Sequence, residues 1–235
     1  MRPVSSTKNA FLKVTHVIFD LDGLILDTET IYTQATNNVV QVYGKTFDWE
    51  VKSQVMGLTG EEAARKLVKL LDLPITWKEY YLLAQQQYQL LMPNAKFMPG
   101  AENLIKHLSQ NKVPIAVATS SSKDSANLKT AKYKDTFNLF SHIVTGGSDP
   151  EVKHGKPSPD IFLVCASRFA DSPDPQKCLV FEDAPNGVLA ATEAGMQCVM
   201  VPDEHITTEQ TRQATQVLKS LTDVKLELFG LPPLK

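Results

Sequence analysis

Short apolar segments alternate with longer helical patterns along most of this 235-residue chain. The strand-like segments are 16–20, 113–118, 142–145, 178–182 and 197–201. The helical patterns between them cover 100–111, 122–132, 158–169 and 185–195. Apolar strands that alternate with helices form a parallel sheet whose two faces are both covered. The sequence therefore predicts an α/β fold with a doubly wound, Rossmann-like parallel sheet.

One interval is too long for this alternation. The segment between Asp22 and Thr119 greatly exceeds the roughly 30 residues of a strand, helix and strand unit. Four helical patterns fill it, at 29–43, 47–56, 60–72 and 76–92. We therefore expect a small helical cap domain, 28–97, inserted into a core made of 14–27 and 98–235. Residues 1–13 are expected to be a flexible tail, although their basic, acid-free composition also suits a weak organellar address.

Composition narrows the classes of function. Lys and Arg number 24 against 26 Asp and Glu, so the formal net charge is −2. That balance argues against a nucleic-acid partner bound by bulk charge. The three cysteines lack C-x-x-C spacing and are expected to be reduced and mostly buried. No apolar stretch is long enough to cross a membrane, so we expect no membrane partner. We also expect the protein to be cytoplasmic and monomeric.

Polar side chains follow three of the predicted strands, at the point where each strand ends. They are Asp20 and Asp22, Thr119 and Ser120, and Glu182 and Asp183. The loop "KHGKPSPD" supplies Lys156 before a helix. Because functional crevices lie outside the carboxyl ends of parallel strands, these groups converge if the three strands are neighbours.

The chemistry of this set favours a phosphoryl group as the ligand. Packed carboxylates raise one another's pKa values unless a cation holds them ionised, and oxygen ligands favour Mg²⁺. Lys156 adds positive charge, and hydroxyl and backbone N–H groups can donate to phosphate oxygens. Asp20 can attack phosphorus, while Asp22 can protonate the leaving oxygen and then deprotonate water. A simpler alternative is that Asp20 and Asp22 shape a turn and that Thr119 and Ser120 cap a helix.

Four motifs in this order resemble those of the haloacid dehalogenase-like phosphatases. They are "DLDG" at 20–23, "ATSS" at 118–121, "GKPSPD" at 155–160 and "FEDAPNG" at 181–187. The resemblance implies that Asp20 is the nucleophile and Asp22 the acid/base, with Thr119, Ser120 and Lys156 binding phosphate. It also implies that Mg²⁺ is held by Asp20, the Asp22 backbone carbonyl and Asp183, with Glu182 supporting the ion. The inserted helices would be the family's mobile cap.

Further segments, such as "MPGAENLIKHL" and "FSHIVTGG", resemble the pseudouridine-5′-phosphatase branch nearly end to end. This similarity implies a small phosphorylated metabolite as substrate, with pseudouridine 5′-phosphate hydrolysed to pseudouridine and phosphate. Met56 and Gly57 lie in a loop that could face substrate, although Met56 could equally pack within the cap.

Two alternatives stay open. The chain could be a sugar-phosphate mutase, or a phosphatase for glycerol, hexose or deoxysugar phosphates. Mutases of this family carry a cap-loop Arg that grips a second phosphate, and the matching position here is Gly60, which favours hydrolysis. The second alternative is a non-catalytic scaffold, which the intact Asp20, Asp22, Lys156 and Asp183 argue against.

Overall fold

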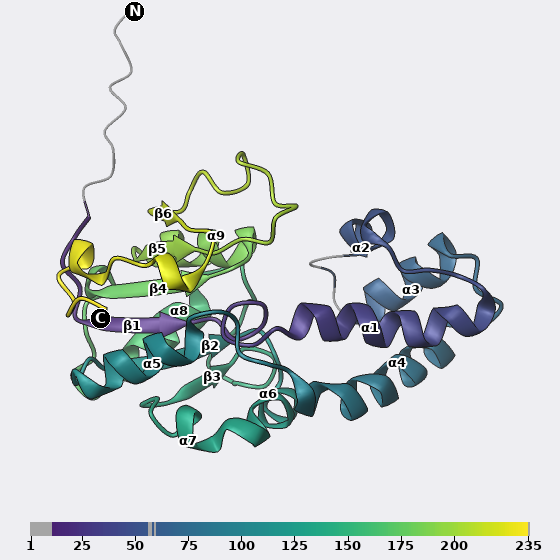
Figure 1. Ribbon diagram of the computed structural model, residues 1–235, viewed down its shortest axis with the longest axis horizontal. Helices are drawn as coiled ribbons and strands as arrows, with labels where there is room; N and C mark the ends of the chain where they lie inside the picture. The colour runs from purple at the N-terminus through teal and green to yellow at the C-terminus, as the bar shows by residue number, and fades with distance from the viewer. Residues whose placement is uncertain (1–10, 56–57, 59, 235) are drawn as a thin grey trace, which may run out of the picture. The chain divides into compact units, whose positions relative to one another are not determined.

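The structure is a computed structural model that describes residues 11–55, 58 and 60–234 (Figure 1). The chain divides into two compact units. One consists of the segments that end at Leu26 and resume at Phe97, and the other is Asp27–Lys96. Each unit has its own architecture and its own buried apolar side chains.

The first unit is built on a six-stranded parallel sheet in the order β3-β2-β1-β4-β5-β6. The strands are β1 (His16–Phe19), β2 (Ile115–Thr119), β3 (Ile143–Thr145), β4 (Cys178–Glu182), β5 (Gln197–Met200) and β6 (Gln216–Val217). This arrangement confirms the predicted fold class. The sequence did not predict β6, because two residues are too few to show an alternating apolar pattern.

Helices cover both faces of the sheet because alternate strand residues point to opposite sides. Ile18 and its neighbours Ala116 and Val180 belong to one buried cluster that α8 and α9 complete. On the other side Phe19 stacks on Phe181, with ring centroids 5.1 Å apart. The helices of this unit are α5 (Ala101–Gln110), α6 (Lys123–Thr130), α7 (Lys134–Phe137), α8 (Asp160–Ser167) and α9 (Pro185–Glu193), with the 3-10 helices η3 (Ala131–Tyr133) and η4 (Pro175–Lys177).

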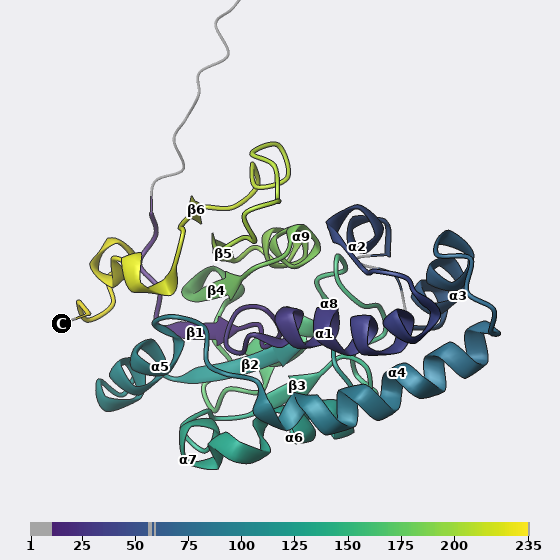
Figure 2. The same cartoon turned by 45° about the vertical axis from the view of Figure 1, so that its right-hand side comes forward.

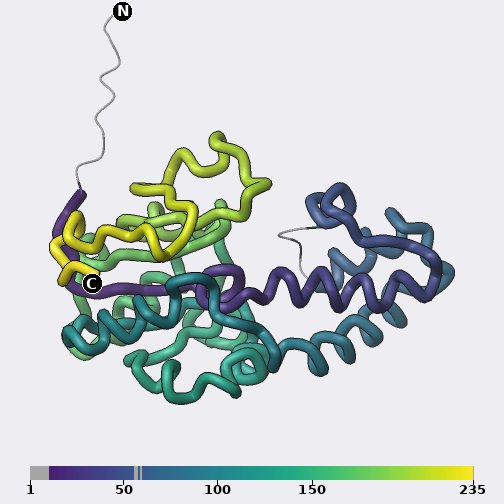
Figure 3. Tube along the Cα trace, in the orientation of Figure 1, coloured from purple at the N-terminus to yellow at the C-terminus, as the bar shows by residue number. Residues whose placement is uncertain are grey.

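The C-terminal segment lies beside the start of β1, as Figure 3 shows by its yellow and purple tubes. It contains the 3-10 helices η5 (Leu221–Asp223) and η6 (Leu226–Phe229). The backbone N–H of Val14 donates to the carbonyl of Phe229 at 2.9 Å, which joins the two segments. The three cysteines, Cys165, Cys178 and Cys198, are free and buried, as expected.

The second unit is entirely helical in the part that the structure describes. It contains α1 (Thr28–Val40), η1 (Gln41–Tyr43), α2 (Trp49–Val55), α3 (Gly60–Leu70), α4 (Trp77–Leu91) and η2 (Met92–Asn94). Helices α1 and α4 lie side by side (Figures 1 and 2). Thr76 and Glu79 form a capping box that fixes the start of α4. Within the described residues, every helix is too short or too polar to cross a membrane.

Gly100 tests the contact between the start of α5 and the C-terminal segment. Its φ is +85°, and an added Cβ would lie 2.8 Å from the Thr222 backbone nitrogen. We expect Gly100→Ala to lower the free energy of unfolding by about 2–4 kcal/mol, from left-handed backbone strain and overpacking together. The control is Gly195→Ala, where φ is +78° with nothing within 4 Å, so that only the strain of about 1–2 kcal/mol applies. Equal losses in urea titrations of the two variants would contradict this account.

Candidate active site

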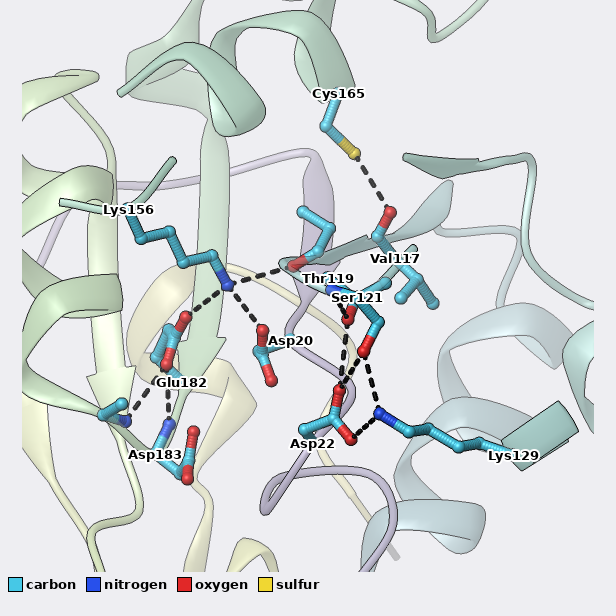
Figure 4. A network of polar contacts seen from close by, with 12 residues as sticks. Asp20, Asp22, Val117, Thr119, Ser121, Lys129, Lys156, Cys165, Glu182 and Asp183 are labelled. Carbon is cyan, nitrogen blue, oxygen red and sulfur yellow. Dashed lines mark hydrogen bonds and ion pairs between the residues drawn. The ribbon is translucent and has the colours of Figure 1, made fainter. Parts of the chain in front are cut away.

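Three adjacent strands of the sheet, β2, β1 and β4, deliver the predicted polar residues to one place (Figure 4). Asp20 follows β1, and its backbone N–H donates to the carbonyl of Phe181 on β4 at 3.0 Å. The chain then turns at Gly23, whose φ of +79° is a conformation that glycine adopts without strain. The Gly23 N–H donates to the Leu26 carbonyl at 2.9 Å, and this tight turn holds Asp22 just beyond the strand end.

Lys156 lies at the centre of the site. Its ammonium group donates to Asp20 Oδ1 at 2.5 Å, to Glu182 Oε1 at 2.7 Å and to the Ala118 carbonyl at 3.1 Å. The side chain is only 7% exposed. The loop that carries it is anchored by Asp160, whose carboxylate accepts hydrogen bonds from the backbone N–H groups of Lys153 and His154. Lys156 therefore reaches all three central strands from a fixed loop.

The Glu182 carboxylate is seated on the start of α9. Its Oε2 accepts hydrogen bonds from the backbone N–H groups of Asp183 and Ala184, at 3.0 and 3.1 Å. The approach to the helix is possible only because residue 187 is glycine. A Cβ at Gly187 would lie 1.8 Å from Glu182 Oε1. This contact explains the glycine in "FEDAPNG" on packing grounds, without a role in substrate binding.

Burial and neighbouring charges shift the pKa values of Asp20 and Lys156 from their usual values. Burial raises the pKa of Asp20 to about 7, with Lys156 opposing the rise and the Glu182 and Asp22 carboxylates adding to it. For Lys156, burial would lower the pKa, but the Asp20 and Glu182 carboxylates outweigh it and hold the pKa above its usual value. The ammonium group is therefore charged at neutral pH, whereas Asp20 needs further positive charge to be fully ionised.

The same carboxylates fit a hard divalent cation. Asp20, Glu182 and Asp183 each offer an oxygen, and these oxygens lie within 4.8 Å of one another. Oxygen-only donors of this kind suit Mg²⁺. Burial raises the pKa of Asp20, and the Glu182 and Asp22 carboxylates add to the rise, so a cation bound here would favour the ionised form of Asp20. Both Glu182 oxygens already accept hydrogen bonds, from Lys156 and from the Asp183 N–H, which suits Glu182 to a supporting role beside the ion.

Asp22 belongs to a second polar cluster next to the first (Figure 4). Its Oδ2 accepts hydrogen bonds from the hydroxyl groups of Ser121 at 2.9 Å and Thr119 at 3.3 Å. Its Oδ1 accepts one from the ammonium group of Lys129 at 2.6 Å. Sequence reasoning missed Ser121 and Lys129. The signal available for Lys129 was weak, because a lysine within "KDSANLKT" usually lies on the solvent-exposed face of a helix.

The remaining predicted site residues differ in how far they are exposed to solvent. Thr119 is fully buried at the end of β2, whereas Ser120, which follows it, is exposed. Met56 and Gly57, expected to face substrate, lie outside the residues that the structure describes. The roles in phosphate and substrate binding given to these residues stay predictions.

Comparisons with known proteins identify the family of this chain. The family model described as haloacid dehalogenase-like hydrolase matches residues 17–201. A Drosophila melanogaster protein named "Probable pseudouridine-5′-phosphatase" is 56% identical over 220 residues, which cover 94% of this chain and 95% of that protein. The Arabidopsis thaliana (DL)-glycerol-3-phosphatase 2 is 46% identical over 223 residues, covering 94% of this chain and 92% of that protein.

A solved structure supports the fold. The HAD family hydrolase from Deinococcus radiodurans, crystallised with bound phosphate and sodium, has a TM-score of 0.79 at 22% identity. The match covers 94% of this chain and 98% of that one. On the family model and the two relatives above, this chain belongs to the haloacid dehalogenase-like hydrolase family, as its four motifs predicted.

Proposed function

We propose that this protein is a Mg²⁺-dependent phosphomonoesterase that hydrolyses pseudouridine 5′-phosphate to pseudouridine and phosphate through an aspartyl-phosphate. One observation carries the proposal: the Asp20 carboxylate lies at a strand end, where it accepts a hydrogen bond from Lys156 and lies close to the carboxylates of Glu182 and Asp183. The choice of substrate rests on the 56% identity to the Drosophila protein.

The residues of the site divide the chemistry among them. Asp20 attacks phosphorus and forms the new P–O bond as the ester oxygen leaves, while Asp22 gives that oxygen a proton. Asp22 then takes a proton from the water that attacks the aspartyl-phosphate, which releases phosphate and restores Asp20. Lys156, with Thr119 and Ser120, offsets charge on the phosphoryl oxygens. Mg²⁺, held by Asp20, the Asp22 backbone carbonyl and Asp183, with Glu182 supporting it, would supply further positive charge there.

Hydrolysis is favoured over mutase chemistry by the second unit. The position expected to carry a phosphate-gripping arginine in mutases is Gly60, the first residue of α3. The nearby Arg65 is engaged within its own unit, where it pairs with Glu61 at 2.7 Å and lies 3.9 Å from the Trp77 ring centroid. A phosphatase for glycerol phosphate is the second candidate, because the Arabidopsis relative shares 46% identity.

We further propose that the enzyme acts in the cytoplasm as a monomer on a small phosphorylated metabolite, with no nucleic-acid or membrane partner. The nearly balanced charge argues against binding of a polyanion. Three free cysteines suit a reducing compartment.

A substrate panel tests the proposed function. Among phosphomonoesters of pseudouridine, uridine, glycerol and glucose, assayed with Mg²⁺, we expect the highest kcat/KM for phosphate release from pseudouridine 5′-phosphate. Asp20→Asn should lower turnover by at least about 1,000-fold because it removes the nucleophile. Its fold should survive, since one buried acid is neutralised, and exposed Asp135→Asn is the control with unchanged activity.

The outcomes of the panel separate the alternatives. If activity were highest on glycerol phosphate, that ester would take the place of pseudouridine 5′-phosphate as the proposed substrate. Isomerised product without free phosphate would indicate a mutase. Absence of turnover on every ester would indicate a scaffold.

Metal binding can be measured without turnover. Mg²⁺ should raise the melting temperature of the purified protein, because it relieves repulsion among buried carboxylates. At a concentration 100 times its Kd, the gain in unfolding free energy is about 2.7 kcal/mol. Asp183→Asn should abolish most of this gain, whereas Asp135→Asn should leave it intact. An equal Mg²⁺ effect on all three proteins would contradict the assigned ion site.

A further inference from the structure

A second buried lysine, Lys129, lies near the end of α6. Its side chain is only 1% exposed. Its ammonium group donates to Asp22 Oδ1 at 2.6 Å and to Ser121 Oγ at 2.8 Å, and the Ser121 hydroxyl in turn donates to Asp22 Oδ2 at 2.9 Å (Figure 4). The Lys129 and Ser121 side chains therefore contact both oxygens of one carboxylate and also each other.

Stability alone gives a poor reason for this arrangement. Removing an ammonium group from water costs several kcal/mol, and apolar residues of similar volume often replace buried ion pairs at no loss of stability. Lys129 lies on the inner face of α6 with Ala126, at a position where a methionine would fill the same space. A charge at this position is better explained by what it does to Asp22.

The contacts fix the orientation of the Asp22 carboxyl group. This side chain lies just before the turn at Gly23 and is 23% exposed, so its orientation depends on the polar groups that contact its two oxygens. A hydrogen bond to one oxygen leaves rotation about that contact, whereas separate donors on Oδ1 and Oδ2 define the plane of the group. Proton transfer needs such alignment, since a misplacement of about 1 Å can cost about 100-fold in rate.

We propose that Lys129 is a positioning residue that, together with Ser121, orients Asp22 for proton transfer to the leaving oxygen and from water. The inference rests on the proposed phosphatase function, in which Asp22 is the acid/base. In this view each buried lysine serves one aspartate: Lys129 orients Asp22, whereas Lys156 contacts Asp20 and offsets charge on the phosphoryl group.

Leaving-group dependence distinguishes this role from a structural one. An alkyl phosphate leaves as a strongly basic alkoxide and needs a proton, whereas p-nitrophenolate leaves without one. In Lys129→Met, we expect kcat/KM for the preferred alkyl ester to fall about 10- to 100-fold. The value for p-nitrophenyl phosphate should fall less than about threefold, since that reaction bypasses the acid. Lys132→Met, which removes an exposed lysine beyond the end of α6, is the matched control and should leave both values unchanged.

Ser121→Ala keeps the ion pair and tests the same role where Lys129→Met does not fold. It should lower kcat/KM for the alkyl ester about three- to tenfold, in line with the loss of the hydrogen bond to Asp22 Oδ2, and spare the aryl ester. Equal losses on both esters, or no loss on the alkyl ester, would overturn the inference. A wild-type protein that releases phosphate from neither ester would instead refute the proposed function, and the inference with it.

Discussion

The ammonium group of Lys156 between Asp20 and Glu182 is the interaction on which the site depends. These three groups come from three segments far apart in the sequence and are almost fully buried. Burial favours neutral carboxyl groups, so the acids can stay charged here only if positive charge lies against them. Lys156 contacts two carboxylates, and the oxygens of Asp20, Glu182 and Asp183 lie within 4.8 Å of one another. A divalent cation such as Mg²⁺ would offset the excess of negative charge and would favour binding of an anionic phosphoryl group.

The sheet order and two backbone features create this arrangement. Because β1 lies between β2 and β4, Asp20 is flanked on each side by a strand that ends in polar residues. The two residues before α9 supply N–H groups to Glu182, and the absence of a side chain at Gly187 lets the carboxylate approach the helix. The positive φ of Gly23 turns the chain directly after Asp22, so that the Leu26 N–H donates to the Leu21 carbonyl near the strand end.

The sequence predicted the elements with a strong local signal. Apolar runs identified five strands, and the acids after them identified Asp20, Glu182 and Asp183, because parallel strands place their carboxyl ends at one edge. Lys129 and Ser121 could not be found in this way. Their contacts with Asp22 depend on where α6 and the end of β2 lie relative to that residue, and neither the helical period nor the charge of Lys129 reveals those contacts. Ser120 and Ser121 are adjacent serines that the sequence alone cannot tell apart, and only the structure shows that Ser121 contacts Asp22.

The central claim is that Asp20 accepts the phosphoryl group covalently, and chemical trapping tests it most directly. Protein mixed with Mg²⁺ and the preferred phosphomonoester would be quenched in acid during turnover, digested and examined by mass spectrometry. The account predicts a phosphoryl group on the peptide that contains Asp20, located at that residue by fragmentation. A phosphoryl group on a different residue, or turnover without any covalent adduct, would contradict it.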